Sequence, residues 1–151
     1  MLSVRQEPWE STDGVRLRAA QRTELDARYG SDDHEPGSPP TAESVTVFLI
    51  ARDGTGTAVG CGGLRLLGPD SAEIKRMYVI PSARGTGVAT TILRALEHAA
   101  RDAGVRTLLL ETGTAQPEAI RFYEREGYHR IDNFGPYRGE ALSVCYARQL
   151  P

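Results

Sequence analysis

Near the middle of the chain a short cluster of apolar residues is followed by apolar residues at helical spacing, and this pattern predicts a strand followed by a helix. Residues 73–80 place Ile, Met, Tyr and Val in one short run, which is typical of a strand. Pro81 ends this strand because proline has no N–H to donate to a sheet. After a turn, apolar residues recur every three or four positions, as on one face of a helix: Val88, Ile92, Leu96, Ala99 and Ala103. A strand therefore leads through a short turn into a helix.

Similar patterns on both sides of this unit predict a sheet with helices on its faces. Further strands are expected at residues 2–6, 45–51, 58–67, 105–110, 128–131 and 141–150, and further helices at about 12–29 and 117–127. Thr12 or Asp13 is expected to cap the first helix, and Val15, Leu25 and Tyr29 are expected among its apolar contacts. The order β-α-β-β-β-α-β-α-β-β indicates an α/β (α+β) domain with a mixed sheet.

The turn between the central strand and its helix is suited to bind an anion. The first turn of a helix has unpaired N–H groups and a partial positive charge, and Gly85 and Gly87 carry no side chains that would keep a phosphate away. Arg84 adds a full charge with several donors. An ordinary connection between a strand and a helix would also contain such residues, so the local pattern leaves both interpretations open.

Composition and charge exclude some classes of protein. The 151 residues are 40% hydrophobic and 25% charged, as expected for one globular domain covering residues 1–151. A formal net charge of −2 argues against binding nucleic acid through its phosphates. No run reaches the roughly 18 apolar residues of a membrane span, and residues 1–10 lack the hydrophobic region of a signal peptide. We therefore expect a cytoplasmic protein with no nucleic-acid or membrane partner.

Cysteine and histidine do not form a recognisable metal or disulfide pattern. Cys61 and Cys145 each lie in an apolar, strand-like run, so we interpret both as small core residues. His34, His98 and His129 are far apart in the sequence and match no metal-binding spacing. We expect no metal.

Residues 31–41 read as an exposed loop, because they combine glycine and prolines with Asp32, Asp33 and Glu35. Such a loop could attract a cationic substrate or could be a solvated linker, and its composition does not decide between them.

Two sequence motifs resemble signatures of the GNAT acyltransferase superfamily. Residues 84–89, Arg-Gly-Thr-Gly-Val-Ala, fit the R-x-x-G-x-G/A turn, and residues 119–128, Ala-Ile-Arg-Phe-Tyr-Glu-Arg-Glu-Gly-Tyr, resemble A-x-x-F-Y-x-x-x-G-F/Y. The two motifs lie about 30 residues apart on the expected elements, and the resemblance covers roughly residues 45–150. It implies a mostly antiparallel seven-stranded sheet flanked by helices.

The resemblance also implies acetyl-CoA (coenzyme A) as cosubstrate, with no metal. The turn would hold its diphosphate, and the pantetheine arm would lie beside the central strand like an additional strand. The implied binding residues are Met77, Tyr78, Val79, Arg84, Gly85, Thr86, Gly87, Val88, Ala89, Thr90, Gln116 and Tyr123. Gln116 stands where the family often has Asn, so its contact with pantetheine is in question.

Transfer of the acetyl group to an amine requires movement of protons. A lysine-like amine with a pKa of ~10.4 is protonated at pH 7, so a base must deprotonate it before it attacks. The resemblance suggests Glu73 as that base, although a glutamate at a strand end is usually only solvated, and Glu111 is a second candidate. It also suggests that Tyr123 protonates the leaving thiolate, whereas without the family Tyr123 would be interpreted as core packing.

Three functions therefore remain to be compared. The first is an acetyl-CoA-dependent N-acetyltransferase acting on a primary amine of a small molecule or peptide, with Tyr29, Tyr137 and the acidic loop near the acceptor. The second is a regulatory domain that binds acyl-CoA without catalysis. The third is a dinucleotide-binding oxidoreductase, since Glu111 lies about 24 residues after Gly87. A homodimer is also a reasonable expectation, because the C-terminal strand is expected near a sheet edge.

Overall fold

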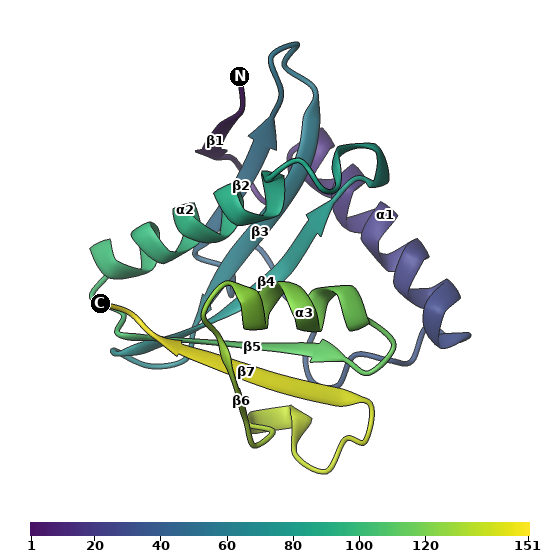
Figure 1. Cartoon of the computed structure of the whole chain (residues 1–151), viewed down its shortest axis with the longest axis vertical. Coiled ribbons are helices and arrows are strands. Elements are labelled where there is room, and N and C mark those ends of the chain that lie inside the picture. The colour runs from purple at the N-terminus through teal and green to yellow at the C-terminus, as the bar shows by residue number, and fades with distance from the viewer.

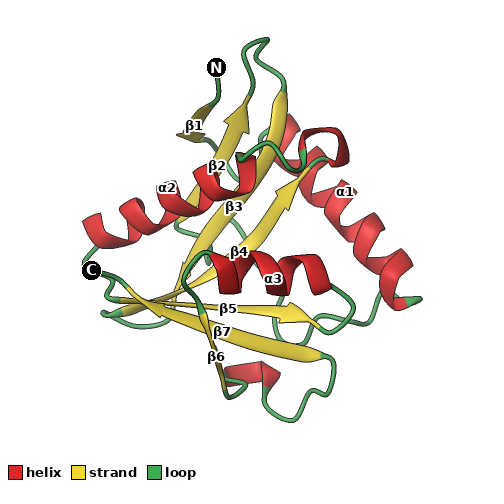
Figure 2. Ribbon diagram, viewed as in Figure 1, coloured by secondary structure: helices red, strands yellow, loops and turns green.

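Seven strands form one sheet between layers of helices in the computed structural model, which describes residues Met1–Pro151 (Figures 1 and 2). The strands are β1 Ser3–Gln6, β2 Val47–Arg52, β3 Ala58–Leu66, β4 Ser71–Val79, β5 Thr107–Gly113, β6 His129–Ile131 and β7 Ser143–Gln149. The helices are α1 Thr12–Tyr29, α2 Val88–Asp102 and α3 Pro117–Arg125, with short 3-10 turns η1 Pro81–Ala83 and η2 Gly135–Tyr137. The predicted fold class and order of elements are confirmed. No helix combines the length and apolar character needed to cross a membrane.

The strands lie in the order β1-β2-β3-β4-β5-β7-β6, and β4 and β5 are the one parallel pair. The C-terminal strand β7 is not itself an edge, because the three-residue β6 pairs with its outer side. As a short edge strand, β6 offers few unpaired backbone groups for pairing with another chain. The sheet edge therefore does not decide whether two copies of the chain associate, and the homodimer stays a prediction.

Alternating residues of β2 build a core on each face of the sheet. Phe48 and Ile50 belong to a cluster with Leu17 of α1, whereas Leu49 and Ala51 belong to the larger cluster that includes the buried face of α2. Side chains of a strand point to opposite faces in turn, so one apolar strand can serve both layers. Figure 1 shows α2 and α3 over one face of the sheet. Both cysteines are free and fully buried, as expected for core residues.

Helix α1 begins differently from the prediction. Its cap is Ser11, whose Oγ accepts a hydrogen bond of 3.1 Å from the backbone N–H of Gly14, and neither Thr12 nor Asp13 has this role. Val15 was expected in an apolar contact, but it is 49% exposed. Leu17 is the buried side chain instead, because α1 touches the sheet along a narrow stripe. Gly30, in the left-handed conformation with φ of 68°, ends the helix as predicted.

A buried carboxylate connects α2 to the C-terminal half of the sheet. Glu97 of α2 is 2% exposed and accepts hydrogen bonds from the hydroxyl of Tyr128 and the guanidinium groups of Arg94 and Arg148, each at 2.8 Å. Burial would raise the pKa of Glu97, but these three donors outweigh it and hold the pKa below its usual value. The carboxylate is therefore ionised and fully paired in the folded protein.

A bulge in β4 separates this strand from β5. Arg76 has a φ of 57°, in the left-handed region, and the pairing with β3 shifts between Cys61 and Gly63, so two residues of β4 face Gly62. Residues 71–74 of β4 pair with residues 107–110 of β5, and no pairing continues beyond Ile74. A side-chain-bearing residue in this conformation costs about 1–3 kcal/mol. The result is a gap between two parallel strands at their C-terminal ends.

Candidate active site

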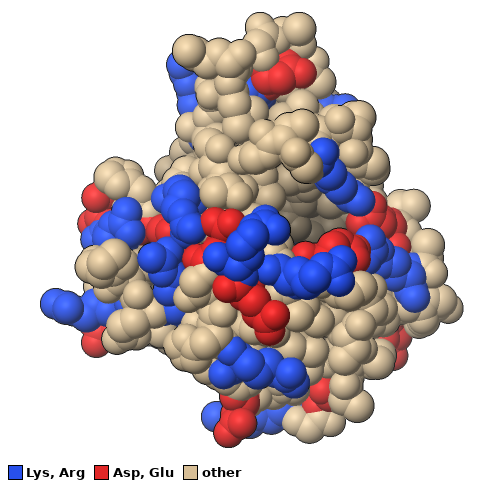
Figure 3. Space-filling model, in the orientation of Figure 1, with Lys and Arg blue, Asp and Glu red and all other residues tan.

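The larger cavity of the protein, with a volume of about 510 Å³, lies beside this gap. It is lined by the end of β4, the turn that leads into α2, the facing side of α1 and helix α3. Figure 3 shows a hollow in this region, with basic and acidic side chains around its rim. A volume of this size is typical of a site for a small molecule or a cosubstrate.

The turn before α2 offers a row of free backbone donors to the larger cavity. No N–H group from Gly85 through Thr90 donates a hydrogen bond within the protein. Gly85 and Gly87 have φ values of 77° and 89°, and a Cβ at either position would meet no atom within 4 Å. The surface in front of these amides is therefore open. Free amides at a helix N-terminus favour an anion such as a phosphate group.

The structure places nearly all of the residues predicted to hold acetyl-CoA along this one cavity. Those that line it are Met77, Tyr78, Val79, Arg84, Gly85, Gly87, Val88, Ala89, Thr90, Gln116 and Tyr123. Thr86 does not line it, and its hydroxyl donates a hydrogen bond of 2.6 Å to the carbonyl of Ala83. The side-chain amide of Gln116 donates to the hydroxyl of Tyr29 at 3.3 Å.

Arg84 has structural contacts besides its place at the cavity wall. Its Nε donates to the carbonyl of Val79 at 2.9 Å, and its Nη2 forms an ion pair of 2.7 Å with Glu24 of α1. Glu24 also lines the larger cavity, so part of the charge of Arg84 is already neutralised. The unpaired backbone amides are therefore the stronger feature for binding an anion.

A smaller cavity of about 110 Å³ adjoins the larger one within the gap between β4 and β5. The two cavities share a set of lining residues from α1, β4 and α3: Gln21, Leu25, Met77, Gln116, Ala119 and Tyr123. Gln21 donates its Nε2 to the carbonyl of Met77 at 2.9 Å, and its Oε1 is buried without a hydrogen-bond partner. A molecule in one cavity would therefore reach a molecule in the other.

Tyr123 lies where the two cavities meet. Its ring packs edge to face against Phe122 and Tyr128, with centroid distances of 5.1 and 5.7 Å. Its hydroxyl makes no hydrogen bond within the protein, and burial raises the pKa of the phenol above its ordinary value. The hydroxyl therefore stays protonated at neutral pH and can donate to a bound molecule.

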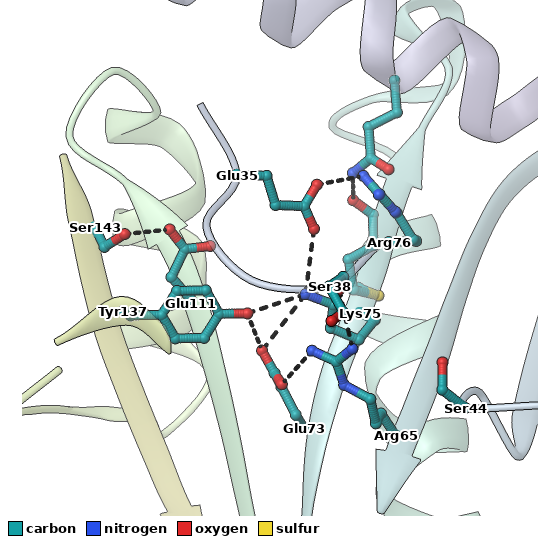
Figure 4. A network of polar contacts seen from close by, with 12 residues as sticks. Glu35, Ser38, Ser44, Arg65, Glu73, Lys75, Arg76, Glu111, Tyr137 and Ser143 are labelled. Atoms are coloured by element: carbon teal, nitrogen blue, oxygen red, sulfur yellow. Dashed lines mark hydrogen bonds and ion pairs between the residues drawn. The ribbon is translucent and has the colours of Figure 1, made fainter. Parts of the chain in front are cut away.

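The two carboxylates considered as bases occupy different environments (Figure 4). Glu111 lines the smaller cavity, and burial raises its pKa to about 7, although a hydrogen bond of 2.8 Å from Ser143 opposes this shift. Glu73 lines neither cavity and is 2% exposed. It is held by Arg65 at 3.1 Å and by the hydroxyl of Tyr137 at 2.5 Å. Glu111 therefore has the position and the pKa of a base, whereas Glu73 is part of an ion-pair network.

Other residues at the smaller cavity were not predicted from the sequence. Lys75 and Arg76 line it, and their neighbouring positions in an apolar strand were a signal that could have identified them. Tyr29, at the end of α1, and Glu35, in the acidic loop, also line the smaller cavity, and the expectation that they lie near an acceptor stays a prediction. Tyr137 does not line it, and its hydroxyl lies between Glu73 and Lys75 instead.

Comparison with known proteins agrees with the geometry of the site. The family model for acetyltransferases of the GNAT family matches residues 3–128. An IAA acetyltransferase from Azospirillum brasilense is 40% identical over 104 residues, which are 68% of this chain and 67% of that protein. An uncharacterized N-acetyltransferase from Schizosaccharomyces pombe (strain 972 / ATCC 24843) is 29% identical over 103 residues, 68% of this chain and 62% of its own length.

Solved structures show the same fold. A candidate acyl-CoA N-acyltransferase from Klebsiella pneumoniae subsp. pneumoniae MGH 78578 matches with a TM-score of 0.84 and 34% identity, over 100% of this chain and 99% of that chain. A GNAT family acetyltransferase from Elizabethkingia anophelis with acetyl-CoA bound has a TM-score of 0.72 at 15% identity, over 99% of this chain and 98% of that chain. The chain therefore belongs to the acetyltransferase (GNAT) family.

Proposed function

We propose that the protein is an acetyl-CoA-dependent N-acetyltransferase that moves the acetyl group directly from the thioester to a primary amine. One observation carries this proposal: the larger cavity, with its free amides, and the smaller cavity, with Glu111, meet at the unpaired hydroxyl of Tyr123. Such an arrangement would bring a thioester, an amine, a base and an acid together without a covalent enzyme intermediate.

Acetyl-CoA fits the larger cavity by its chemistry. The amides of residues 85–90 would bind the diphosphate, and the edge of β4 at residues 77–79 that β5 leaves unpaired would lie beside the pantetheine arm. The relative from Elizabethkingia anophelis has acetyl-CoA bound, which supports this choice of cosubstrate.

Glu111 and Tyr123 would handle the two protons of the reaction. The protonated amine gives one proton to the carboxylate of Glu111, and its nitrogen then forms a bond to the acetyl carbon. The bond from carbon to sulfur breaks as Tyr123 donates its hydroxyl proton to the departing thiolate, and the nitrogen releases its second proton, which restores the hydroxyl of Tyr123. Glu111 passes its proton to water. A base with a pKa of about 7 is about half ionised at neutral pH, which suits this role. We therefore assign the base to Glu111 in preference to Glu73.

The proposal is tested by incubating the protein with acetyl-CoA and a panel of primary amines while the release of free thiol is measured. We expect thiol release that depends on the amine, and a matching N-acetylated product by mass spectrometry. A protein that binds coenzyme A but releases no thiol with any amine would instead be a regulatory domain.

The same preparation separates the transferase from an oxidoreductase. The sheet is mostly antiparallel and lacks the two parallel halves of a dinucleotide-binding domain. In a thermal-shift assay we therefore expect stabilisation by acetyl-CoA and none by NAD. Stabilisation by NAD alone would contradict the proposal.

A further inference from the structure

Two cationic side chains are buried at the smaller cavity. The side chains of Lys75 and Arg76 are 7% and 10% exposed, and both line this cavity. Glu35 of the loop between α1 and β2 reaches both, with its Oε1 at 3.3 Å from Lys75 and its Oε2 at 2.9 Å from Arg76 (Figure 4). One carboxylate therefore bridges two buried cations.

Arg76 depends on this carboxylate more than Lys75 does. Lys75 also contacts Glu73 at 3.6 Å and the hydroxyl of Tyr137 at 3.0 Å, whereas Glu35 is the only ion-pair partner of Arg76. Burial would raise the pKa of Glu35, but the two cations outweigh it and hold the pKa below its usual value. Without a carboxylate at this position, a buried guanidinium would remain unpaired, which is strongly unfavourable.

With Glu35 in place, the smaller cavity is small for a ligand site. Its volume of about 110 Å³ is below the roughly 300–1,000 Å³ of ligand sites. Most of its lining residues belong to α1, β4, β5 and α3, but His34 and Glu35 come from a loop without regular structure. The loop is therefore the part of the wall that an acceptor can displace.

We propose that the acceptor carries a carboxylate as well as its amine, and that this carboxylate replaces Glu35 between Lys75 and Arg76. This inference rests on the proposed function, because it names the acceptor of that reaction. The acceptor is then a small amino-acid-like molecule whose amine faces Glu111 across the same cavity. Gln21 also lines the cavity, and its Oε1 has no hydrogen-bond partner within the protein. An amine without a carboxylate would displace Glu35 and leave Arg76 unpaired.

Binding of the reaction product tests the inference without requiring catalysis. The probes are N-acetyl derivatives of glycine, alanine, serine, aspartate and glutamate, each compared by calorimetry with the same compound as its primary amide, in the presence of coenzyme A. We expect at least one N-acetyl amino acid to bind about 10-fold or more tighter than its amide. Equal binding of acid and amide throughout the panel, or binding of neither, would overturn the inference.

Two substitutions test the roles of Arg76 and of Glu35, its ion-pair partner in the protein. Arg76→Gln should weaken binding of the carboxylate probe about 10-fold or more and should not weaken binding of the amide, while Glu35→Gln should tighten binding of the carboxylate by removing its competitor. Arg5→Gln is the control, because Arg5 is exposed and has no ion pair. A thermal shift by coenzyme A verifies that each variant is folded, and Arg76→Lys, which keeps the charge, should recover part of the affinity. Tighter binding of acids that is unaffected by Arg76→Gln would contradict the assignment.

Transfer assays then distinguish the two proposals. If acids are preferred in binding but no amine is acetylated, the proposed function fails and the carboxylate site remains. If amines without a carboxylate are acetylated as well as amino acids, the proposed function stands and the carboxylate site is refuted.

Discussion

Glu111→Gln removes the proposed base while it keeps the shape of the side chain. The amide oxygen can still accept the hydrogen bond from Ser143, so the local structure should be maintained. Loss of a general base typically lowers the rate of the chemical step by about 10²–10⁴-fold. In the wild-type protein we expect kcat/KM to rise with pH through the pKa of Glu111, about 7, because only the ionised carboxylate can accept a proton.

The same substitution should stabilise the fold at high pH. The pKa of Glu111 is raised from 4.5 to about 7 in the folded state, so folding favours the protonated form. Its contribution to stability is fully present below pH 4.5 and is lost as pH rises through about 7. The difference between 4.5 and about 7, at about 1.36 kcal/mol per pH unit, corresponds to about 3 kcal/mol. Glu111→Gln carries no charge to desolvate, so it should gain up to about 3 kcal/mol over wild type at pH 8 and little at pH 4.

Urea unfolding at pH 4 and pH 8, together with thiol release between pH 6 and pH 9, measures both effects. Glu10→Gln is the matched control, because Glu10 is exposed and forms no ion pair, and it should change neither quantity. A Glu111→Gln variant that keeps its activity within about 3-fold and shows the wild-type pH profile would refute the role of Glu111. Glu73→Gln would then be the next variant to measure.

Three further predictions follow from the structure. Tyr123→Phe should lower kcat about 10²-fold without changing the melting temperature, because the hydroxyl has no partner in the protein; retained kcat would exclude it as the acid. Gly87→Ala should destabilise the fold by about 1–2 kcal/mol and weaken binding of coenzyme A, since its φ is 89°, whereas Gly68→Ala, outside the left-handed region, should do neither in the same calorimetric titration. Glu97→Gln should lower the unfolding free energy at pH 7 by about 3 kcal/mol. The difference in unfolding free energy between wild type and this variant should become smaller below pH 4.5, because Glu97 with its lowered pKa then becomes protonated. A difference that stays the same at low pH would contradict the lowered pKa of Glu97.

Local sequence patterns were sufficient to predict most of the fold and the glycine-containing turn before α2. The turn at residues 84–90 depends on glycines at positions with positive φ and on the periodic apolar face of the helix that follows, and both are visible in a short stretch of sequence. Tyr123 was identified only from the resemblance of residues 119–128 to a family signature, because its place on a short amphipathic helix alone indicated core packing. The turn is determined by neighbours in the sequence, so no knowledge of tertiary contacts was needed to predict it.

The arrangement of charged residues around the smaller cavity could not be predicted because it depends on contacts between distant segments. Glu73 and Glu111 both lie in apolar strands, and only the packing shows that Arg65 and Tyr137 occupy one carboxylate while the other faces a cavity. The contact of Glu35 with Lys75 joins residues 40 positions apart through a loop that has no regular structure. Periodicity carries no information about such pairs.

Arg76 connects the backbone of the site with its electrostatics. Its left-handed φ of 57° shifts the register of β4, so that Lys75 and Tyr78 lie on the same face although they are three positions apart, and β5 no longer pairs with the strand. Glycine would adopt this conformation without the steric cost, so the backbone alone does not account for an arginine at this position. Its side chain instead supplies a buried cation beside the gap that the bulge opens, and Glu35 pairs with this cation at 2.9 Å. In the proposal above, opening of the gap and recognition of an acceptor's carboxylate both depend on Arg76. Arg76→Gly should therefore keep the gap, and hence the binding of coenzyme A, while it loses the preference for acids.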